Sequence, residues 1–421
     1  MPNPSVNHLP QKTSRFFYGY TVAGAALLIM LMMFATRYVF GVFFKPTLSE
    51  FGWTRAMTSG AFSLSMFMEG LLGILMGMLT DRFGPRAVLT LCGFFLGIGC
   101  LLMSRVNALW QFYLFFGVIM GIGISGGWVP LLTTIARWFV KKRGLMSGIV
   151  LTGTSLGAVI APPVGEWLIS AYNWRTSYTI MGIVVFALIV FSAQLLRRDP
   201  YEMGQRPDGG VKGRVPDSST VIAGVAFRDA FSTRQFWSIL IMYWCFGFCF
   251  FTVMVHIVPH STDLGIASAA AARILATIGG LTCFGRIFLG KAADRIGARW
   301  IFIIGFILFT ATFFWMVQAD QIWMIYFFAI PFGFLQGGMG ASESPLVADI
   351  FGLRSHGSIL GFSSFGFTFG AAVGPLLGGY IFDVTGTYQF AFLICALLSI
   401  AGLILTVFLK QAFTGSSNPG Y

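Results

Sequence analysis

Four ionisable side chains fall inside long apolar stretches of this sequence: Arg37, Glu69, Arg286 and Glu343. A charged side chain at the centre of a membrane helix costs roughly 2.5–3.5 kcal/mol on insertion scales, so such residues are functional candidates. A guanidinium can bind a carboxylate through two parallel hydrogen bonds, and a buried, unpaired carboxylate favours proton uptake. These residue types therefore predict anion recognition linked to protonation.

The four charges sum to zero, as an apolar environment demands. Arg37 and Glu69 lie in the first half of the chain, and Arg286 and Glu343 lie in the second. We expect each half to form its own ion pair. An incoming carboxylate would then take Arg286 from its partner, and the displaced glutamate would bind a proton. Glu69 and Glu343 are the predicted proton carriers.

His256 is a third candidate for proton coupling. It stands four residues before His260, and we expect Pro259 to end the helix between them, at its outer end. This arrangement does not predict a metal site. The six cysteines fall within apolar stretches without metal-ligand spacing, and no nucleophile or phosphate-binding motif is found. The sequence therefore predicts no cofactor and no enzymatic activity.

The elements that position these residues are membrane helices. Hydrophobic residues make up 56% of the 421 residues and charged residues 10%, with a mean hydropathy of +0.80. Twelve apolar segments between residues 17 and 409 are each long enough to cross a hydrocarbon core of about 30 Å as a helix. Arg286 lies eight residues, or about 12 Å of helix, before Asp294 at the end of its segment. The fold class is therefore an all-α membrane protein.

The net charge of +12 has an uneven distribution along the chain. Of the 27 lysines and arginines, 20 lie in the two tails and the even-numbered connections, and 5 lie in the odd-numbered connections. Basic residues accumulate on the cytoplasmic side of membrane proteins. We therefore expect both termini and the central loop to be cytoplasmic, in the inner or plasma membrane of the cell. Since the charge follows topology, nucleic acid is not an expected partner.

The chain repeats itself at an offset of 213 residues. The pattern Gly-x-x-x-Asp-Arg-x-Gly-x-Arg occurs at 77–86 and again at 290–299, and further Gly, Pro and Trp positions keep the same offset without gaps. Even helix number makes the two repeats parallel. We predict a cytoplasmic tail (1–16), a six-helix bundle (17–196), a cytoplasmic linker (197–234), a second six-helix bundle (235–409) and a cytoplasmic tail (410–421).

The repeated loop pattern resembles the signature of the major facilitator superfamily. The resemblance covers nearly the whole chain. It implies two six-helix bundles around a central cavity and transport by alternating access. It also implies that the two loops form a cytoplasmic gate between the halves, with Asp81, Arg82, Asp294 and Arg295 as its residues. Physically, an aspartate there can pair with arginine and cap neighbouring helix N-termini.

The segment RWFVKKRGLMSGIVLTGTSLG, 137–157, resembles the monocarboxylate transporters and the related bacterial oxalate/formate group. That resemblance implies that Arg286 contacts substrate. Thr282 stands where animal members carry an aspartate, and Tyr38, next to Arg37, stands where they carry a lysine. The eleventh apolar segment lacks the lysine of oxalate transporters, so recognition of two anionic groups would depend on Arg37 and Arg286. The predicted substrate-binding residues are Arg286, Arg37, Tyr38 and Thr282.

The first hypothesis is proton-coupled symport of a small organic anion, most simply a monocarboxylate, with the protein functioning as a monomer in the lipid bilayer. An organic-anion exchanger or a dicarboxylate carrier is the alternative, favoured if Arg37 and Arg286 face one cavity. A membrane sensor would usually carry an added soluble domain. Drug export is a lesser option, because 158–165 and 371–379 somewhat resemble the superfamily's antiporter motif.

Overall fold

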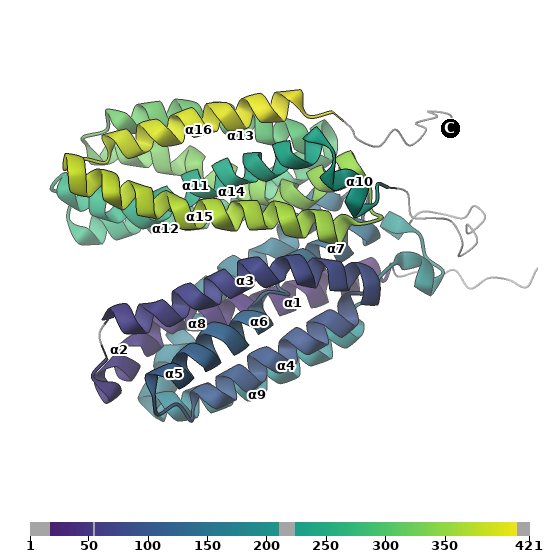
Figure 1. The fold of residues 1–421 in the computed structure, drawn as a ribbon, viewed down its shortest axis with the longest axis horizontal. Helices are drawn as coiled ribbons and strands as arrows, with labels where there is room; N and C mark the ends of the chain where they lie inside the picture. The colour runs from purple at the N-terminus through teal and green to yellow at the C-terminus, as the bar shows by residue number, and fades with distance from the viewer. Residues whose placement is uncertain (1–16, 54, 210–223, 411–421) are drawn as a thin grey trace, which may run out of the picture.

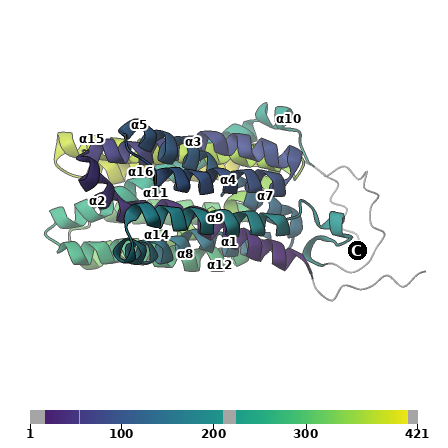
Figure 2. The same cartoon turned by 90° about the horizontal axis from the view of Figure 1, so that it is seen from below.

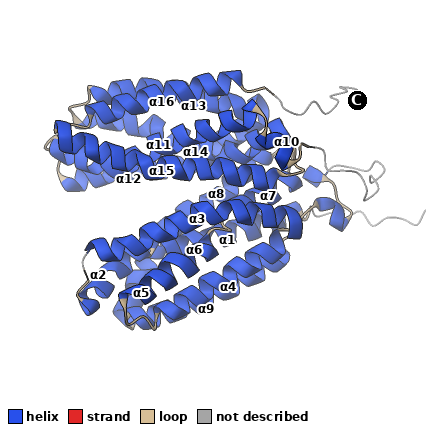
Figure 3. Ribbon diagram, viewed as in Figure 1, coloured by secondary structure: helices blue, strands red, loops and turns tan. Residues whose placement is uncertain are grey.

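The computed structural model describes residues 17–53, 55–209 and 224–410, and within these ranges it is helical, without strands (Figure 3). The only β-pairing among them is an isolated antiparallel bridge between Gly224 and Gly352. Twelve helical segments are long and apolar enough to cross a membrane. Both ends of the described chain, residues 17 and 410, lie on one side of the molecule, which we call the terminal side (Figures 1 and 2).

The first six spans contain shorter helices as well as long ones. They comprise α1 (Gly19–Tyr38), α2 (Phe40–Phe51), α3 (Arg55–Phe83), α4 (Pro85–Met103), α5 (Leu109–Phe112), the π-helix η1 (Tyr113–Met120), α6 (Gly121–Ile124), α7 (Val129–Trp138), α8 (Arg143–Ala171) and α9 (Trp174–Leu195).

The linker and the last six spans follow. They comprise the 3₁₀ turns η2 (Pro200–Met203) and η3 (Pro207–Gly209), then α10 (Phe227–Phe231), α11 (Arg234–Asp263), α12 (Ser268–Ile296), α13 (Ala298–Val317), α14 (Ile322–Phe351), α15 (His356–Thr385) and α16 (Gln389–Phe408).

The helices form two bundles that follow the sequence repeat (Figure 1). In the first half α1 packs on α8 and α4 on α9, and in the second half α11 packs on α15, α12 on α14 and α13 on α16. The halves meet where α8 packs on α12 and α3 packs on α15. α14 also packs on α7 and α8, and α15 on α7, so helices of both halves line the space between them.

The repeated loop pattern has a direct backbone explanation. Gly84 and Gly297, which are 213 residues apart, have φ of 81° and 92°, in the region that favours glycine. Each residue immediately precedes a helix, and Pro85 opens α4 at a position where the missing N–H costs nothing. The repeated spacing within the chain therefore reflects two similar helix-to-helix turns.

Glycines allow the two halves to approach closely. A Cβ atom on Gly290 would lie 2.5 Å from the carbonyl oxygen of Gly144, and one on Gly77 would collide with the carbonyl oxygen of Gly357. These pairs are equivalent under the 213-residue offset. In lipid, helices associate through close packing of small residues rather than through the hydrophobic effect. The two halves thus make close backbone contact at two equivalent points.

Pro259 does not end its helix, contrary to our prediction. α11 continues through Pro259 to Asp263. Side chains satisfy carbonyls near the missing N–H: Ser261 Oγ donates to Ile257 O at 2.7 Å, and Thr262 Oγ1 donates to Pro259 O at 2.8 Å. Membrane helices tolerate proline when such local donors and acceptors are available.

The fourth span is interrupted inside the bundle. α6 ends at Ile124, residues 125–128 form a turn, and α7 begins at Val129. The interruption contains Gly126 and Gly127, which lack helix propensity, and Pro130 follows in the first turn of α7. The preceding π-helical stretch adds a second irregularity of a kind that often marks functional sites.

Candidate functional site

A cavity of about 500 Å³ lies between the two halves. Most of its lining is apolar, with a small number of charged and polar groups, which is typical of small-molecule sites. All four ionisable residues singled out from the sequence line it: Arg37, Glu69, Arg286 and Glu343. Tyr38 and Thr282 also line it, and six of the seven predicted substrate and proton residues are thereby brought together.

Arg37 and Glu69 form the ion pair expected within the first half. Arg37 Nη2 lies 2.8 Å from Glu69 Oε2, and Arg37 Nη1 donates to Glu69 Oε1 at 3.3 Å. The side chains are 14% and 21% exposed, so the pair faces the cavity while keeping most of its surface covered. The residues lie on α1 and α3, and the two parallel contacts fix the guanidinium plane.

Arg286 and Glu343 do not form the second ion pair that we predicted. Arg286 Nη1 instead donates to Leu151 O, Thr154 Oγ1 and Ser155 Oγ, at 2.6, 2.5 and 2.9 Å. These acceptors lie on α8, in the other half. The reason is close packing, because a Cβ atom on Gly148 of α8 would collide with the carbonyl oxygen of Arg286.

This environment leaves the charge of Arg286 without an anionic partner. The residue is 8% exposed, and its acceptors are a carbonyl and two hydroxyls. Among the described residues, the ion pairs include no carboxylate bound to Arg286. A buried, unpaired cation in a cavity is a strong site for an anion, since the anion would supply the missing compensation.

Glu343 is held by neutral donors from both halves. Trp128 Nε1 donates to Glu343 Oε2 at 3.0 Å from the break in the fourth span, and Ser364 Oγ donates to Oε1 at 2.8 Å from α15. Tyr243 OH donates to the backbone carbonyl of Glu343 at 3.0 Å. Glu343 is 7% exposed. It therefore has hydrogen bonds but no counter-charge, which is an environment suited to changes in protonation.

Thr282 and Tyr38 complete the predicted substrate set. Thr282 lies one helical turn before Arg286, on the same face of α12, and its Oγ1 donates to Ile278 O at 2.8 Å. Tyr38 is the last residue of α1 and is 43% exposed. Both therefore border the same space as the two arginines.

His256 lies apart from this cavity. Its Nε2 lies 2.9 Å from Pro375 O, and its ring packs 5.0 Å from the ring of Tyr388. It is 8% exposed and does not line the cavity. His256 and His260 belong to no cluster of metal-binding side chains among the residues that the structure describes. The structure thus separates His256 from the other predicted proton carriers.

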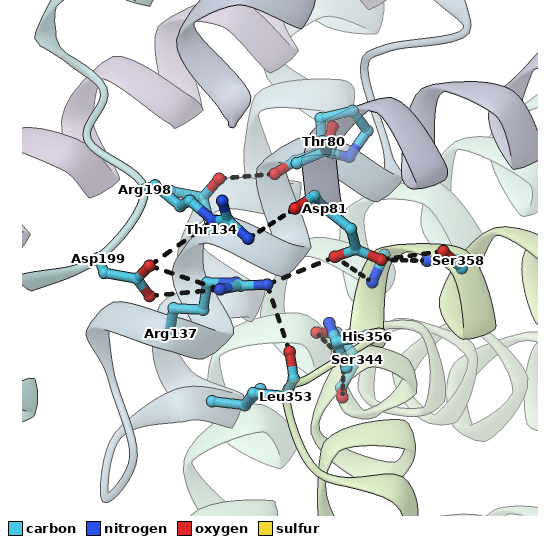
Figure 4. Close-up of polar contacts among 12 residues, drawn as sticks. Thr80, Asp81, Thr134, Arg137, Arg198, Asp199, Ser344, Leu353, His356 and Ser358 are labelled. Atoms are coloured by element: carbon cyan, nitrogen blue, oxygen red, sulfur yellow. Dashed lines mark hydrogen bonds and ion pairs between the residues drawn. The ribbon is translucent and has the colours of Figure 1, made fainter. Parts of the chain in front are cut away.

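The first copy of the loop pattern joins the halves through Asp81 (Figure 4). Its carboxylate accepts hydrogen bonds from Gly357 N at 3.1 Å, Ser358 N at 2.8 Å and Ser358 Oγ at 3.0 Å, at the start of α15. Arg137 Nη2 lies 3.4 Å from Asp81 Oδ1 and also donates to Leu353 O at 3.3 Å. Arg137 Nη1 lies 3.4 Å from Asp199 Oδ1.

The second copy joins the halves through Asp294. Its carboxylate accepts from Gly144 N at 2.5 Å and Leu145 N at 2.9 Å, at the start of α8. Both aspartates thus cap the N-terminus of a helix in the opposite half, where the helix dipole favours negative charge. The contacts obey the 213-residue offset, since Gly144 and Leu145 map onto Gly357 and Ser358.

The arginines of the loop pattern do not bind these aspartates. Arg82 is exposed and packs over the ring of Phe83, with 5.1 Å from Cζ to the ring centroid. Arg295 lines a second cavity of about 370 Å³ beside Asp294. Sequence reasoning missed Arg137, which pairs with Asp81. The available signal was the basic segment 137–143, which precedes the helix that Asp294 caps.

The break at residues 125–128 was also missed, although Trp128 there contacts Glu343. The signal was the run Ser-Gly-Gly-Trp-Val-Pro at 125–130, in which two helix-disfavouring glycines precede a proline suited to a new helix start. Ser125, Trp128 and Val129 all line the cavity.

Comparison with known proteins agrees with this architecture. The family model of the Major Facilitator Superfamily matches residues 26–291 and 258–420. Among solved structures, the Escherichia coli fucose:proton symporter has a TM-score of 0.71 at 14% identity, covering 94% of this chain and all of that chain. The xylose:proton symporter XylE has a TM-score of 0.70, also at 14% identity, and covers 94% of this chain and 96% of its own.

Curated relatives place the chain more closely. Monocarboxylate transporter 7 of Homo sapiens is 26% identical, with 90% of this chain and 83% of the relative covered. Monocarboxylate transporter 4 of Rattus norvegicus is also 26% identical, with coverage of 90% and 80%. These matches agree with the resemblance seen at 137–157. The chain belongs to the major facilitator superfamily and is a multi-pass membrane transporter homologous to the monocarboxylate transporters.

Proposed function

We propose that the protein carries a small monocarboxylate together with a proton, by alternating access. The observation that carries this proposal is the buried guanidinium of Arg286, which lines the central cavity and whose acceptors among the described residues are all neutral. A substrate carboxylate would provide its counter-charge. The names of the curated relatives, which are monocarboxylate transporters, point in the same direction.

Proton coupling follows from the charges around the cavity. Bringing one carboxylate to Arg286 adds a negative charge to a site that already holds Glu69 and Glu343. Uptake of one proton restores the balance, and the pair of ions then crosses without net charge. Glu343 is the stronger candidate for the carrier, because its contacts are neutral, whereas Glu69 is paired with Arg37.

The contacts between the two halves support assigning this structure to one state of the transport cycle. We assign the terminal side to the cytoplasm, because the basic residues gather there, and we propose that Asp81 and Asp294 form the cytoplasmic gate, closed in this structure. Arg286 and Glu343 add contacts across the same interface. Occupation of Arg286 by substrate would weaken its hold on α8 and so favour opening toward the cytoplasm.

The proposal also covers the division of the chain into bundles, its membrane and its oligomeric state. We divide the protein into two six-helix bundles, 17–196 and 235–409, joined by the linker 197–234, with short cytoplasmic tails, in the plasma or inner membrane. The cavity lies between the two halves of the chain. We therefore expect a monomer to be the functional unit.

Exchange of organic anions or carriage of a dicarboxylate is a second candidate. The favouring observation is that Arg37 and Arg286 line one cavity. In this mode Arg37 would leave Glu69 and bind a second carboxylate. Neutralising Arg37 would then abolish transport of oxalate while leaving transport of acetate or lactate unaffected.

Uptake into proteoliposomes tests both candidates. Labelled lactate, acetate, pyruvate, oxalate and formate are supplied with and without an inward proton gradient, against protein-free liposomes. We expect the gradient to accelerate monocarboxylate uptake, and Arg286→Ala to remove it. The control is Arg105→Ala, which neutralises an exposed arginine away from the cavity. Equal uptake by the parent protein and Arg286→Ala would refute the proposed anchor.

A further inference from the structure

The break in the fourth span places a tryptophan at the meeting point of the two halves. Trp128 precedes α7 as its N-cap residue, with φ −98° and ψ −71°. The carbonyls freed by the break are satisfied locally, since Ser125 Oγ donates to Ile122 O and Gly127 N donates to Ile124 O. Interrupted backbone at membrane depth is tolerated where it lines a cavity, as this segment does. The break therefore has a role at the site.

We propose that Trp128 is the positioning residue through which the charge of Glu343 controls closure between the two halves. Ionised Glu343 holds Trp128 through the indole N–H, and neutral Glu343 releases it. This inference deepens the proposed function, because it rests on Glu343 as the proton carrier.

The geometry separates the two contacts of the carboxylate. Oε2 accepts from Trp128 in the first half, and Oε1 accepts from Ser364 in the same half as Glu343. A hydrogen bond to an ionised acceptor is roughly twice as strong as a neutral one. Protonation therefore weakens both contacts, and of the two it is the Trp128 contact that crosses the interface between the halves.

A chain of contacts leads from Glu343 to the gate. The next residue, Ser344, donates through Oγ to Leu132 O of α7 at 3.3 Å, and its carbonyl lies 3.0 Å from His356 Nε2. His356 is followed by Gly357, whose N–H is bound by Asp81 (Figure 4). Loss of the Trp128 contact would thus weaken the packing of α7 against α14, and α14 is linked through His356 to the Asp81 contact.

Other titratable groups face this region and must be distinguished from Glu343. They are Tyr243 on α11, His356 on α15, Arg37 and Glu69 on α1 and α3, Arg286 on α12, and, six residues further along α14, Asp349 with Arg143 of α8. Replacement of Glu343 alone identifies its share of any pH dependence.

The test is a distance measurement on the full chain in lipid nanodiscs without substrate. Spin labels are placed at Ala87 on α4 and Trp300 on α13, which are exposed, equivalent under the repeat and on the terminal side. Cys283, the one cysteine that is not fully buried, is replaced by serine in every variant. Distance distributions are recorded between pH 5.5 and 8.

We expect the parent protein to shift toward longer distances at low pH, with the open-to-closed ratio rising about tenfold, the difference between a charge-assisted and a neutral hydrogen bond. Glu343→Gln should give the low-pH distribution at every pH. Trp128→Phe should do the same, and combining the two substitutions should add nothing.

The matched control is Trp138→Phe, which removes a buried indole N–H of the same span that donates at 2.8 Å to Arg197 O, at the start of the linker. It should keep the pH response of the parent. Benzothienylalanine at position 128 keeps the bicyclic shape without the N–H and serves if Trp128→Phe does not fold. A parent without pH response, or Trp128→Phe with the parent's response, would overturn the inference.

This outcome is independent of the transport assay. A pH response that is lost in Glu343→Gln but kept in Trp128→Phe would reject the role of Trp128 and leave proton coupling intact. A different result is that the pH response is lost in both Glu343→Gln and Trp128→Phe while uptake by the parent protein does not depend on the proton gradient. That result would reject the proposed function but support the role of the contact between Trp128 and Glu343.

Discussion

The Asp81 and Asp294 contacts occupy equivalent places in the repeat but differ in their side chains. Each aspartate binds two backbone N–H groups at the start of a helix in the opposite half. Asp81 also binds the hydroxyl of Ser358 and the guanidinium of Arg137. At Asp294 the serine is replaced by Leu145.

The arginine at the second contact has a different partner. Arg143 Nη1 lies 3.4 Å from Asp349 Oδ1, and Nε donates to the carbonyls of Ala136 and Phe139. Asp349 is 49% exposed, and the 370 Å³ cavity lies beside it. Both contacts are therefore helix caps, but the contact at Asp81 also includes a buried charge cluster with Arg137 and Asp199. We infer that the halves part first at Asp294.

Neutralising each aspartate in turn should reveal the difference in strength between the two contacts most clearly. Asp81→Asn should destabilise the closed terminal side by about 2–3 kcal/mol, because Arg137 is buried and loses one of two carboxylates. Asp294→Asn should destabilise it by about 1 kcal/mol. The label pair at Ala87 and Trp300 measures the open fraction of each variant. Equal shifts would contradict the asymmetry.

Replacement of Arg137 tests whether the charge cluster makes the difference. Arg137→Gln removes its contacts to Asp81, Asp199 and Leu353, and should open the closed state by about 1–2 kcal/mol. Arg82→Gln is the control, since Arg82 is exposed and stands beside the same aspartate in the sequence. The same label distances serve as the readout. A larger shift for Arg82→Gln would restore the gate role that we predicted for it.

Exchanging Ser358 and Leu145, which follow the glycines bound by the aspartates, should make the two contacts more similar in strength. Ser358→Ala deletes one hydrogen bond to Asp81 and should weaken closure by about 1 kcal/mol. Leu145→Ser should give Asp294 an added donor and strengthen closure by a smaller amount. The distance between the labels at positions 87 and 300, recorded in the two single variants and the double variant, measures the effect of the exchange on closure. If Leu145→Ser opens the terminal side, the helix-cap account of Asp294 is wrong.

The smallest effect is expected on the side opposite the termini, where Glu50 joins α2 to α9 within one half. Partial burial would raise the pKa of Glu50, but hydrogen bonds from Arg175 and Trp174 outweigh it and lower the pKa. Arg175 Nη2 lies 2.7 Å from Glu50 Oε1, with Glu50 42% exposed, so the ion pair contributes at most about 1 kcal/mol.

Because the folded state lowers this pKa, the contribution is present above the unfolded value near 4.3 and is lost as the pH falls through the folded value. Glu50→Gln should therefore lower thermal stability at pH 7, and its effect should shrink as the pH falls below the unfolded value. It should not change the Ala87–Trp300 distance. A change in that distance would show that the two sides are coupled through Glu50.

Much of the frame could be predicted from the sequence because it depends on local rules. Apolar length predicts the spans, and the repeated loop pattern predicts the turns at Gly84 and Gly297 and the caps formed by Asp81 and Asp294. The pairing of Arg37 with Glu69 was also predictable, since opposite charges in an apolar environment compensate each other.

The remainder depends on how the two halves meet, which a single sequence does not specify. Close packing of Gly148 against Arg286 brings the guanidinium to α8, so it never reaches Glu343. Glu343 binds Trp128 instead, across an interface built from distant segments. Pro259 was misread for another reason, because a membrane helix can continue through a proline, as α11 does to Asp263.

The central claim is that Arg286 binds a carboxylate whose passage is tied to a proton. The most direct measurement follows the pH inside proteoliposomes with a trapped dye after a lactate gradient is applied, with the membrane potential clamped. Protein-free liposomes correct for passive permeation of the neutral acid. The account predicts acidification of the lumen that matches lactate uptake, does not depend on the potential, and falls to the protein-free rate in Arg286→Ala. Lactate uptake without acidification, or acidification by Arg286→Ala at the parent rate, would contradict it.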